Sequence, residues 1–487
     1  MAEALFAEFP SAARDQWLDA VLQSLRGQAF DSLLTQTYED IEIHPLSHAD
    51  DLAECQHHHS LPGQFPYLRG TTAAGYHARP WLIAAELDIR EPREFNQALR
   101  EALAQGQTAI TMNSGLKLND AADMRASLAD IELERFPFLI QSETRAPEIH
   151  GWMRAAFAED ALKSMRGCVG YDPLSALARS GTMRDDAFTR LAAHARQVQN
   201  VSPQLGSIAV STAVYHDAGA NAVQELALAI AAGLAYLRPL NERGFTIESI
   251  TAKVHFFLNI GENFFLEIAK FRAFRLLWAQ VLRALGLADA KQRLHVHARS
   301  GSRNKSRLDA QVNLLRLTTE ALSAAMGGVD SIELAPFDQP RGKSDAFSRR
   351  LSRNLQLILQ AELRLVELID PAGGAWHVEK LTDQLARAAW SRFQTIEVAG
   401  GLVASLRSGA IQAEIEAVAA RRRRDLASGD AALVGVNRYL NSDAGLTSVP
   451  IDADAQPAAE SASLRPLQAI RLAEPFEARH AESENRS

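Results

Sequence analysis

The chain of 487 residues has the composition of a globular protein, with 47% hydrophobic and 23% charged residues. It is longer than one compact domain and long enough to bury a large core. The formal net charge is -8 and no basic stripe occurs, so we expect no nucleic-acid or polybasic membrane surface. Only Cys55 and Cys168 are present, and residues 1–17 lack the apolar core of a signal peptide. We therefore predict a soluble, cytoplasmic protein whose ligands are small molecules or other proteins.

The first 50 residues predict an arm for subunit contact, with a helix over 12–25 and a short strand over 41–43. Eight apolar, β-rich runs then follow, separated by segments of helix length. The runs are Trp81–Leu87, Thr108–Met112, Phe136–Ile140, Met165–Tyr171, Ser207–Val214, Lys253–Asn259, Arg293–His297 and Ser331–Leu334. The clearest helices between and after them are 218–237, 263–285, 306–326 and 345–368.

Alternation of strands and helices favours a parallel sheet, and hence an α/β fold. An open doubly wound sheet is the alternative, but no glycine-rich phosphate turn follows the first strand. We therefore predict a (β/α)8 TIM barrel with an N-terminal helical arm and a C-terminal helical extension, the barrel and extension together spanning 51–440. Arg421–Arg424 is predicted to lie on a solvated helix face. Residues 441–487 are predicted to form a linker and a disordered tail, with a short helix over 465–476.

The inner face of the predicted barrel is unusually polar. Outward residues of each strand must be apolar under the helices, so polar alternates are expected to point toward the axis. They are Ser207, Ala209 and Ser211, then Lys253, His255 and Phe257, then His295, His297 and Arg299. Buried polar groups without partners each cost about 1–3 kcal/mol. Either the axis admits a long polar ligand, or these groups satisfy one another.

His216 stands at the carboxyl end of the fifth predicted strand, just before a helix begins, in Val214-Tyr-His-Asp-Ala-Gly219. Chemistry in this fold sits at the carboxyl ends of the strands, and a neutral imidazole there can donate to a carbonyl or move a proton. A capping or packing histidine is an equal alternative. The run His57-His58-His59 is interpreted as a solvated loop, because adjacent histidines point to opposite sides; no other metal-ligand spacing occurs.

Several motifs resemble the acyl-CoA-binding barrel of cobalamin-dependent methylmalonyl-CoA mutases, over residues 8–439. They are Phe65-Pro-Tyr-Leu-Arg-Gly70, Tyr76-His-Ala-Arg-Pro-Trp81, Tyr215-His-Asp-Ala-Gly219, Glu267-Ile-Ala-Lys-Phe-Arg272 and Asp370-Pro-Ala-Gly-Gly374. In that family a pantetheine arm threads the barrel, which would account for a polar interior. The family interconverts methylmalonyl-CoA and succinyl-CoA by adenosylcobalamin-dependent radical rearrangement.

The resemblance implies roles for particular residues. Tyr76, His216 and His297 match positions of the family's active site, and Arg69 matches a position that helps to hold coenzyme A. Lys253 and His255 stand where catalytic chains carry Arg and Ser, and they are candidate coenzyme A contacts.

Three departures bear on activity. Arg299 replaces a glutamine of the catalytic chains, and residues 167–181 replace the motif whose arginine clamps the substrate carboxylate. The Asp-x-His-x-x-Gly signature that supplies the cobalt ligand does not occur. The resemblance is therefore greatest to the small (beta) subunit, so that the chain would belong to an intramolecular-transfer isomerase only as part of a complex.

We expect a non-catalytic small subunit in a heterodimer with a large, cobalamin-carrying subunit, binding no metal and no cobalamin by itself. The alternative is the catalytic acyl-CoA-binding barrel of a split mutase that works with a separate cobalamin-binding protein. A looser reading is a barrel that merely binds an acyl-CoA or assists maturation.

Overall fold

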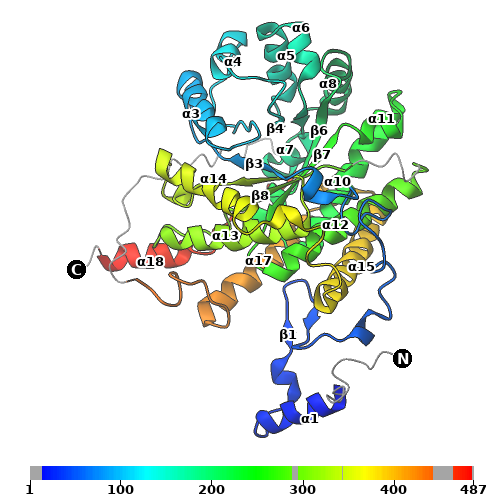
Figure 1. Ribbon diagram of the computed structural model, residues 1–487, viewed down its shortest axis with the longest axis vertical. Coiled ribbons are helices and arrows are strands. Elements are labelled where there is room, and N and C mark those ends of the chain that lie inside the picture. Colours follow the sequence, from blue (N-terminus) through cyan, green and yellow to red (C-terminus); the bar gives the residue numbers. More distant parts are fainter. Residues whose placement is uncertain (1–13, 288–293, 343, 442–463, 485–487) are drawn as a thin grey trace, which may run out of the picture.

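The computed structural model describes residues 14–287, 294–342, 344–441 and 464–484, which form an α/β protein with a TIM-barrel-like fold (Figure 1). Within these ranges seven parallel strands form one curled sheet. Their spatial order is β3 (Leu82–Ala85), β9 (Ser331–Leu334), β8 (Val296–Ser300), β7 (Val254–Ile260), β6 (Leu205–Ser211), β5 (Gly167–Tyr171) and β4 (Phe138–Ser142). The predicted fold class is confirmed.

The segment predicted as the second barrel strand, Thr108–Met112, does not form a regular strand. It forms a single parallel bridge, between Ile110 and Phe138 of β4. On its other side Thr108 N donates to Ile83 O of β3 at 2.9 Å, and the Thr108 hydroxyl accepts from Ile83 N at 2.8 Å. A side chain thus replaces one ladder bond, and the segment still connects the two edge strands of the sheet.

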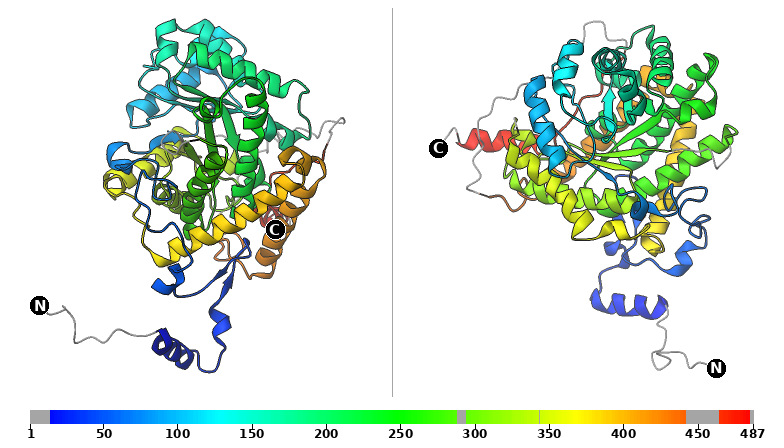
Figure 2. Two further views of the ribbon diagram at one scale, coloured as in Figure 1. Left: turned by 90° about the vertical axis from the view of Figure 1, so that its right-hand side faces the viewer. Right: turned by 45° about the horizontal axis from the view of Figure 1, so that its top comes forward.

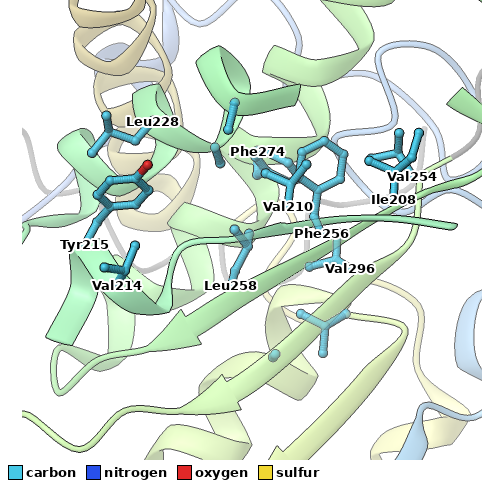
Figure 3. Packing of buried hydrophobic residues seen from close by; sticks show 14 of the residues in the cluster. Ile208, Val210, Val214, Tyr215, Leu228, Val254, Phe256, Leu258, Phe274 and Val296 are labelled. Carbon is cyan, nitrogen blue, oxygen red and sulfur yellow. The ribbon is translucent and has the colours of Figure 1, made fainter. Parts of the chain in front are cut away.

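Helices cover the outer face of the strands. α10 (Ala222–Glu242) and α12 (Phe264–Ala284) match two predicted helices, and both bury most of their residues. Figure 3 shows alternate strand residues packed against them, among them Ile208, Val210 and Phe256. α10 is long and apolar enough to span a membrane, but 83% of its apolar window is buried inside the protein. It is therefore a core helix of the barrel.

The opposite faces of the same strands fill the axis. Cys168, Ala209 and Phe257 form a separate small cluster there, and the rings of Phe257 and His297 lie 5.0 Å apart. A second cluster consists of Ala84, Ala109 and Leu139. The predicted alternation is confirmed for Ala209 and Phe257, because neither belongs to the large cluster under the helices.

The remaining elements surround this barrel and extend it. They are α1 (Arg14–Ser24), η1 (Phe30–Leu33), β1 (Thr35–Gln36), β2 (Glu42–Ile43), η2 (Ala49–Leu52), α2 (Gly75–Ala78), α3 (Pro92–Ala104), α4 (Ala121–Ser127), α5 (Ala146–Ala156), α6 (Glu159–Ser164), α7 (Pro173–Ser180), α8 (Ala187–Val201), α9 (Ala213–Asp217), α11 (Ile247–Thr251), α13 (Gln311–Gly327), η4 (Gln339–Arg341), α14 (Ala346–Ala361), η5 (Leu365–Glu367), α15 (Trp376–Val398), α16 (Leu402–Arg407), α17 (Ala410–Ser428) and α18 (Glu474–Glu484).

The N-terminal arm projects from the barrel, with α1 at its far end (Figure 2). α1 has no fully buried residue, and Trp17 packs edge-on against Phe30 with ring centroids 6.1 Å apart. The β1–β2 hairpin anchors the arm: Tyr38 donates to the Asp425 carboxylate at 2.9 Å, and Asn221 Nδ2 donates to Tyr38 O at 2.6 Å. The hairpin end of the arm is therefore fixed to α10 and α17, and Ser47, farther along the arm, lies 3.3 Å from His377 Nδ1 on α15.

The structure corrects two predictions for the C-terminal part. Arg422, expected on a solvated face, is 6% exposed and pairs with Glu262 at 2.5 Å, because it is held between that carboxylate and the Tyr38 ring. Residues 464–484, expected in a disordered tail, lie against the barrel because Leu464, Leu467 and Leu472 are buried. Their helix is α18, not the predicted 465–476, since Pro475 favours a helix start at that point. Residues 442–463 of the predicted linker lie outside the described residues.

Candidate functional site

His216 lies on α9, the short helix that follows the carboxyl end of β6. The side chain is 3% exposed, and its Nδ1 lies 3.4 Å from Glu225 Oε2 on α10. Burial and the Arg303 guanidinium lower the pKa of His216, although Glu225 opposes them. The imidazole is therefore neutral near pH 7. The bond to Glu225 fixes which ring nitrogen carries the proton, and Nε2 faces Gly301, where a Cβ would lie within 2.6 Å of it.

Behind His216 lies a buried charge network that the sequence analysis did not single out. Lys270 Nζ lies 2.9 Å from Glu225 and 2.6 Å from Glu267. Burial would raise the pKa of Glu225, but Lys270 and His216 hold it well below its usual range. Burial, with Glu225 nearby, raises the pKa of Glu267 to about 7. The sequence did contain an indication of this network, because charged residues stand in otherwise apolar helices. Glu225 lies in the first turn of the apolar α10. Glu267 and Lys270 are three residues apart in the motif Glu267-Ile-Ala-Lys-Phe-Arg272, a spacing at which two side chains of a helix can pair.

His297 lies inside the barrel rather than at its mouth. Its Nδ1 is 2.8 Å from Ser331 Oγ, and its Nε2 is 3.2 Å from Glu333 Oε2 on β9. Arg299, two residues along β8, pairs with Glu333 at 3.8 Å and with Glu86 at 3.3 Å. These polar groups are bonded to one another, which is the second of the two alternatives that the polar pattern left open.

Tyr76 lies at the other end of the strands from His216. It sits on α2, and its hydroxyl donates to the Val329 carbonyl at 2.7 Å, just before β9 begins. Its ring packs edge-on against Trp81 with centroids 5.0 Å apart. Burial raises the pKa of Tyr76. Tyr76 and His216 are therefore not brought together.

Arg69 belongs to a cluster of ion pairs near the same end as Tyr76. It lies 3.4 Å from Glu379 and 3.8 Å from Asp370, and it donates to the His58 carbonyl at 2.8 Å. Arg272 of α12, with no exposed side-chain surface, binds the same two carboxylates. Two arginines thus share two buried acids, and the Arg69 guanidinium is largely committed to the protein.

Lys253 and His255 lie together at the amino end of β7. Lys253 Nζ donates to the carbonyls of Pro203 at 2.5 Å and Leu205 at 2.9 Å. Burial lowers the pKa of Lys253. The His255 ring stacks on His295 with centroids 4.5 Å apart, and burial, with His295 and His297 nearby, holds the pKa of His255 well below its ordinary value. Of the six predicted site residues, Lys253 and His255 are the two that are near each other both in the sequence and in the structure.

The segment 167–181, which replaces the arginine clamp of catalytic chains, presents a buried acid instead. Asp172 ends β5 and caps α7, accepting hydrogen bonds from Ser175 Oγ at 2.7 Å, Ser211 N at 2.9 Å and Tyr236 Oη at 2.5 Å. Burial raises its pKa to about 6. The single arginine of the segment, Arg179, is exposed and pairs with Glu143 at 2.8 Å. Nothing in this segment offers a cation to a substrate carboxylate.

These observations define a barrel protein with a buried histidine at the carboxyl end, a filled polar axis and an arginine cluster at the amino end. The methylmalonyl-CoA mutase family model matches residues 36–116 and 112–481. The chain is 35% identical over 473 residues to the methylmalonyl-CoA mutase small subunit of Streptomyces virginiae, covering 94% of this chain and 75% of that protein. It is 32% identical to the small subunit of Porphyromonas gingivalis, covering 90% and 71%. The large subunit of Streptomyces virginiae is 29% identical, covering 95% and 67%.

The chain therefore belongs to the methylmalonyl-CoA mutase family. The predicted resemblance is confirmed. The family has named small and large subunits, and two of the relatives named small subunit show higher identity to this chain than the large subunit does.

Proposed function

We propose that the chain is the non-catalytic small subunit of a methylmalonyl-CoA mutase, pairing with a large subunit that carries adenosylcobalamin. The observation that carries this proposal is the segment at the carboxyl end of β5. There the buried Asp172 and the apolar Leu174 occupy the region where catalytic chains hold a carboxylate-binding arginine. The one arginine of the segment, Arg179, pairs with Glu143, so this barrel lacks the cation that would select the substrate carboxylate.

The inner residues of the barrel support the same proposal. Arg69 and Lys253, the candidate coenzyme A contacts, are bonded to carboxylates or carbonyls of the protein itself. Tyr76 is bonded to the Val329 carbonyl, at the end of the strands away from His216. These groups already use part of their hydrogen-bonding capacity within the protein.

The described residues do not fit a cobalamin above His216. In the family the corrin ring would have to approach the carboxyl ends of the strands, but here Ile470 N bonds Asp217 O at 2.8 Å and Leu472 N bonds Arg303 O at 2.9 Å. Protein backbone thus lies across the place that the ring would need. We propose that the cofactor reaches the complex only through the partner chain, and we assign this chain no step of the rearrangement.

The function can be tested by reconstitution. The purified chain is mixed with a candidate large subunit, adenosylcobalamin and methylmalonyl-CoA, and both complex formation and turnover are measured. A stable complex that is more active than the large subunit alone is expected. His216→Asn in this chain, which keeps a polar group toward Glu225, should leave that turnover unchanged.

The alternative is the catalytic barrel of a split mutase with a separate cobalamin-binding protein. Under that alternative, His216→Asn abolishes turnover although the complex still forms. Turnover that requires His216, or a chain that forms no complex with any large subunit, would reject the small-subunit proposal.

A further inference from the structure

We propose that residues 464–473 act as a strap that closes the carboxyl-terminal end of the barrel and keeps His216 out of reach of a second protein. This strap leads into α18, drawn in red in Figure 1. The relevance of the closure to a cobalamin-carrying partner rests on the proposed function. The closure itself is a property of this chain alone.

Four backbone bonds define the path of the strap. Leu464 N and Leu467 N donate to Gly181 O and Ala178 O, at the end of α7, at 3.3 and 2.8 Å. Ile470 N and Leu472 N then donate to Asp217 O of α9 and Arg303 O at 2.8 and 2.9 Å. The acceptors follow the carboxyl ends of β5, β6 and β8 in turn. Because β5 to β8 are neighbours in the sheet, the strap runs along this side of the carboxyl-terminal end of the barrel, the end where this fold performs chemistry.

Apolar burial holds the strap in place along its length. Leu467 and Leu472 are 7% and 6% exposed, and Ala473 is fully buried. The glycine after α9 makes room for it: a Cβ on Gly219 would lie 3.3 Å from Ile470 Cδ1. Removing leucine side chains from water stabilises the closed position, so several such contacts give a closure that opens rarely.

An ionic anchor fixes the end of the strap. Glu477 of α18 binds Arg471 with both carboxylate oxygens, at 2.7 and 2.6 Å, and accepts from Arg307 N at 2.7 Å. Glu477 is 5% exposed. The loop after β8, the strap and α18 are thereby joined at one carboxylate.

Arg303 links the strap to the histidine beneath it. Its backbone carbonyl accepts from Leu472 N, while its guanidinium donates to His216 O at 3.1 Å and to Ala220 O at 2.8 Å. Displacing the strap therefore removes a direct contact of the residue that holds α9 in position. We infer that the strap and the exposure of His216 are coupled.

The test measures the reactivity of His216 in the full chain with diethyl pyrocarbonate, which modifies accessible imidazoles. Peptide mass spectrometry gives the rate for His216 and, in the same sample, for the exposed His59. Leu467→Asp with Leu472→Asp places two charges under the strap. Leu315→Asp, at a leucine that is 67% exposed, is the matched control. Hydrogen exchange at the amides of Ile470 and Leu472 reports whether the strap has left the barrel.

The double variant should raise the reactivity of His216 relative to His59 by about tenfold or more, while Leu315→Asp leaves it at the wild-type value. If the double variant does not fold, Glu477→Gln, which loosens the anchor, is judged by the same criterion. The proposal fails if His216 of the wild type reacts as fast as His59, or if His216 stays protected after the strap amides exchange freely. It also fails if the strap amides remain protected in the variants. None of these readouts needs cobalamin, acyl-CoA or a partner, so failure here leaves the small-subunit proposal standing.

Discussion

The Glu225 carboxylate lies 2.9 Å from the Lys270 ammonium in the interior of the protein, joining α10 to α12 across 45 residues of sequence. Both side chains are at most 2% exposed. Lys270 also donates to the Asn259 carbonyl at 2.6 Å, at the end of β7. One cation therefore compensates two buried carboxylates, those of Glu225 and Glu267, and ties two helices to the strand end beside His216.

Lys270→Met should therefore destabilise the chain strongly. The methionine fills a similar volume, but it leaves the Glu225 carboxylate buried without its cation, and breaking one side of a buried pair costs about 3–5 kcal/mol. The free energy of unfolding from urea titration measures this loss. Lys117→Met is the matched control, because the Lys117–Glu91 pair is more than half exposed on both sides, at 58% and 54%. That substitution should cost less than about 1 kcal/mol. Equal losses in the free energy of unfolding for the two variants would show that the buried Lys270 pairs stabilise the chain no more than an exposed pair does.

Arg422→Ala and Arg423→Ala, at neighbouring positions in the run of four arginines, should differ in how far they lower the free energy of unfolding. Arg422 is buried, pairs with Glu262 and stacks on Tyr38 with its guanidinium carbon 4.1 Å from the ring centroid. Arg423 is exposed. We expect a loss of roughly 2–4 kcal/mol for Arg422→Ala and less than about 0.5 kcal/mol for Arg423→Ala in the same unfolding titration. A neutral Arg422→Ala would mean that the hairpin of the arm is not anchored through this residue.

The sequence predicted the strands of the barrel better than it predicted charge partners. Ser331–Leu334 is a strand over the predicted range, because a short apolar run between turn residues has few other solutions. Thr108–Met112 failed as a full strand because side-chain bonds, which no periodicity records, replace part of its ladder. Arg422 was misplaced for a related reason: a helical run of like residues does not show which one faces Glu262, 160 residues away.

The candidate site shows the same limit. His216 was predicted correctly to follow a strand end, since strand order along the chain fixes that position. The sequence could not show that Tyr76 would lie at the opposite end, because α2, which carries it, is a four-residue helix and too short to give a periodic pattern. The strap was missed because its few leucines are scattered in a polar stretch, and only the fold shows that they face the barrel.

Gly219→Ala should destabilise the chain, whereas Gly151→Ala should stabilise it. Gly219 has φ +113°, and a Cβ there would lie 2.6 Å from Ala419 Cβ. The strain and the clash together should cost about 2 kcal/mol or more. Gly151 lies within α5 with nothing within 4 Å of a Cβ, so alanine should gain about 0.5–1 kcal/mol of helix propensity.

Thermal unfolding of the two glycine variants measures both effects, as shifts of the midpoint in opposite directions. A raised midpoint for Gly219→Ala would contradict the close approach of α17 to the end of α9. A lowered midpoint for Gly151→Ala would instead indicate a contact of α5 that the structure does not show.

The stability of the chain should fall in acid through a buried pair of histidines on α5 and α8. The rings of His150 and His194 lie 5.9 Å apart, and burial lowers the pKa of each to about 4. In the unfolded chain their pKa is near 6.5, so the unfolded state binds more protons as the pH drops below that value. Each histidine therefore contributes stability above pH 6.5 that is lost between about pH 6.5 and 4, at up to roughly 1.4 kcal/mol per pH unit.

His150→Asn should reduce this pH slope, because it removes one of the two buried imidazoles that must take up a proton. Ser202→Ala is the control: it removes the partner 3.2 Å from His150 Nε2 but leaves the imidazole in place. We expect Ser202→Ala to lower the free energy of unfolding by a similar amount at every pH and to keep the wild-type slope. Urea titrations at about pH 7, 6 and 5 give the slope of the free energy of unfolding against pH for each variant. A wild-type slope in His150→Asn would mean that other groups cause the acid sensitivity.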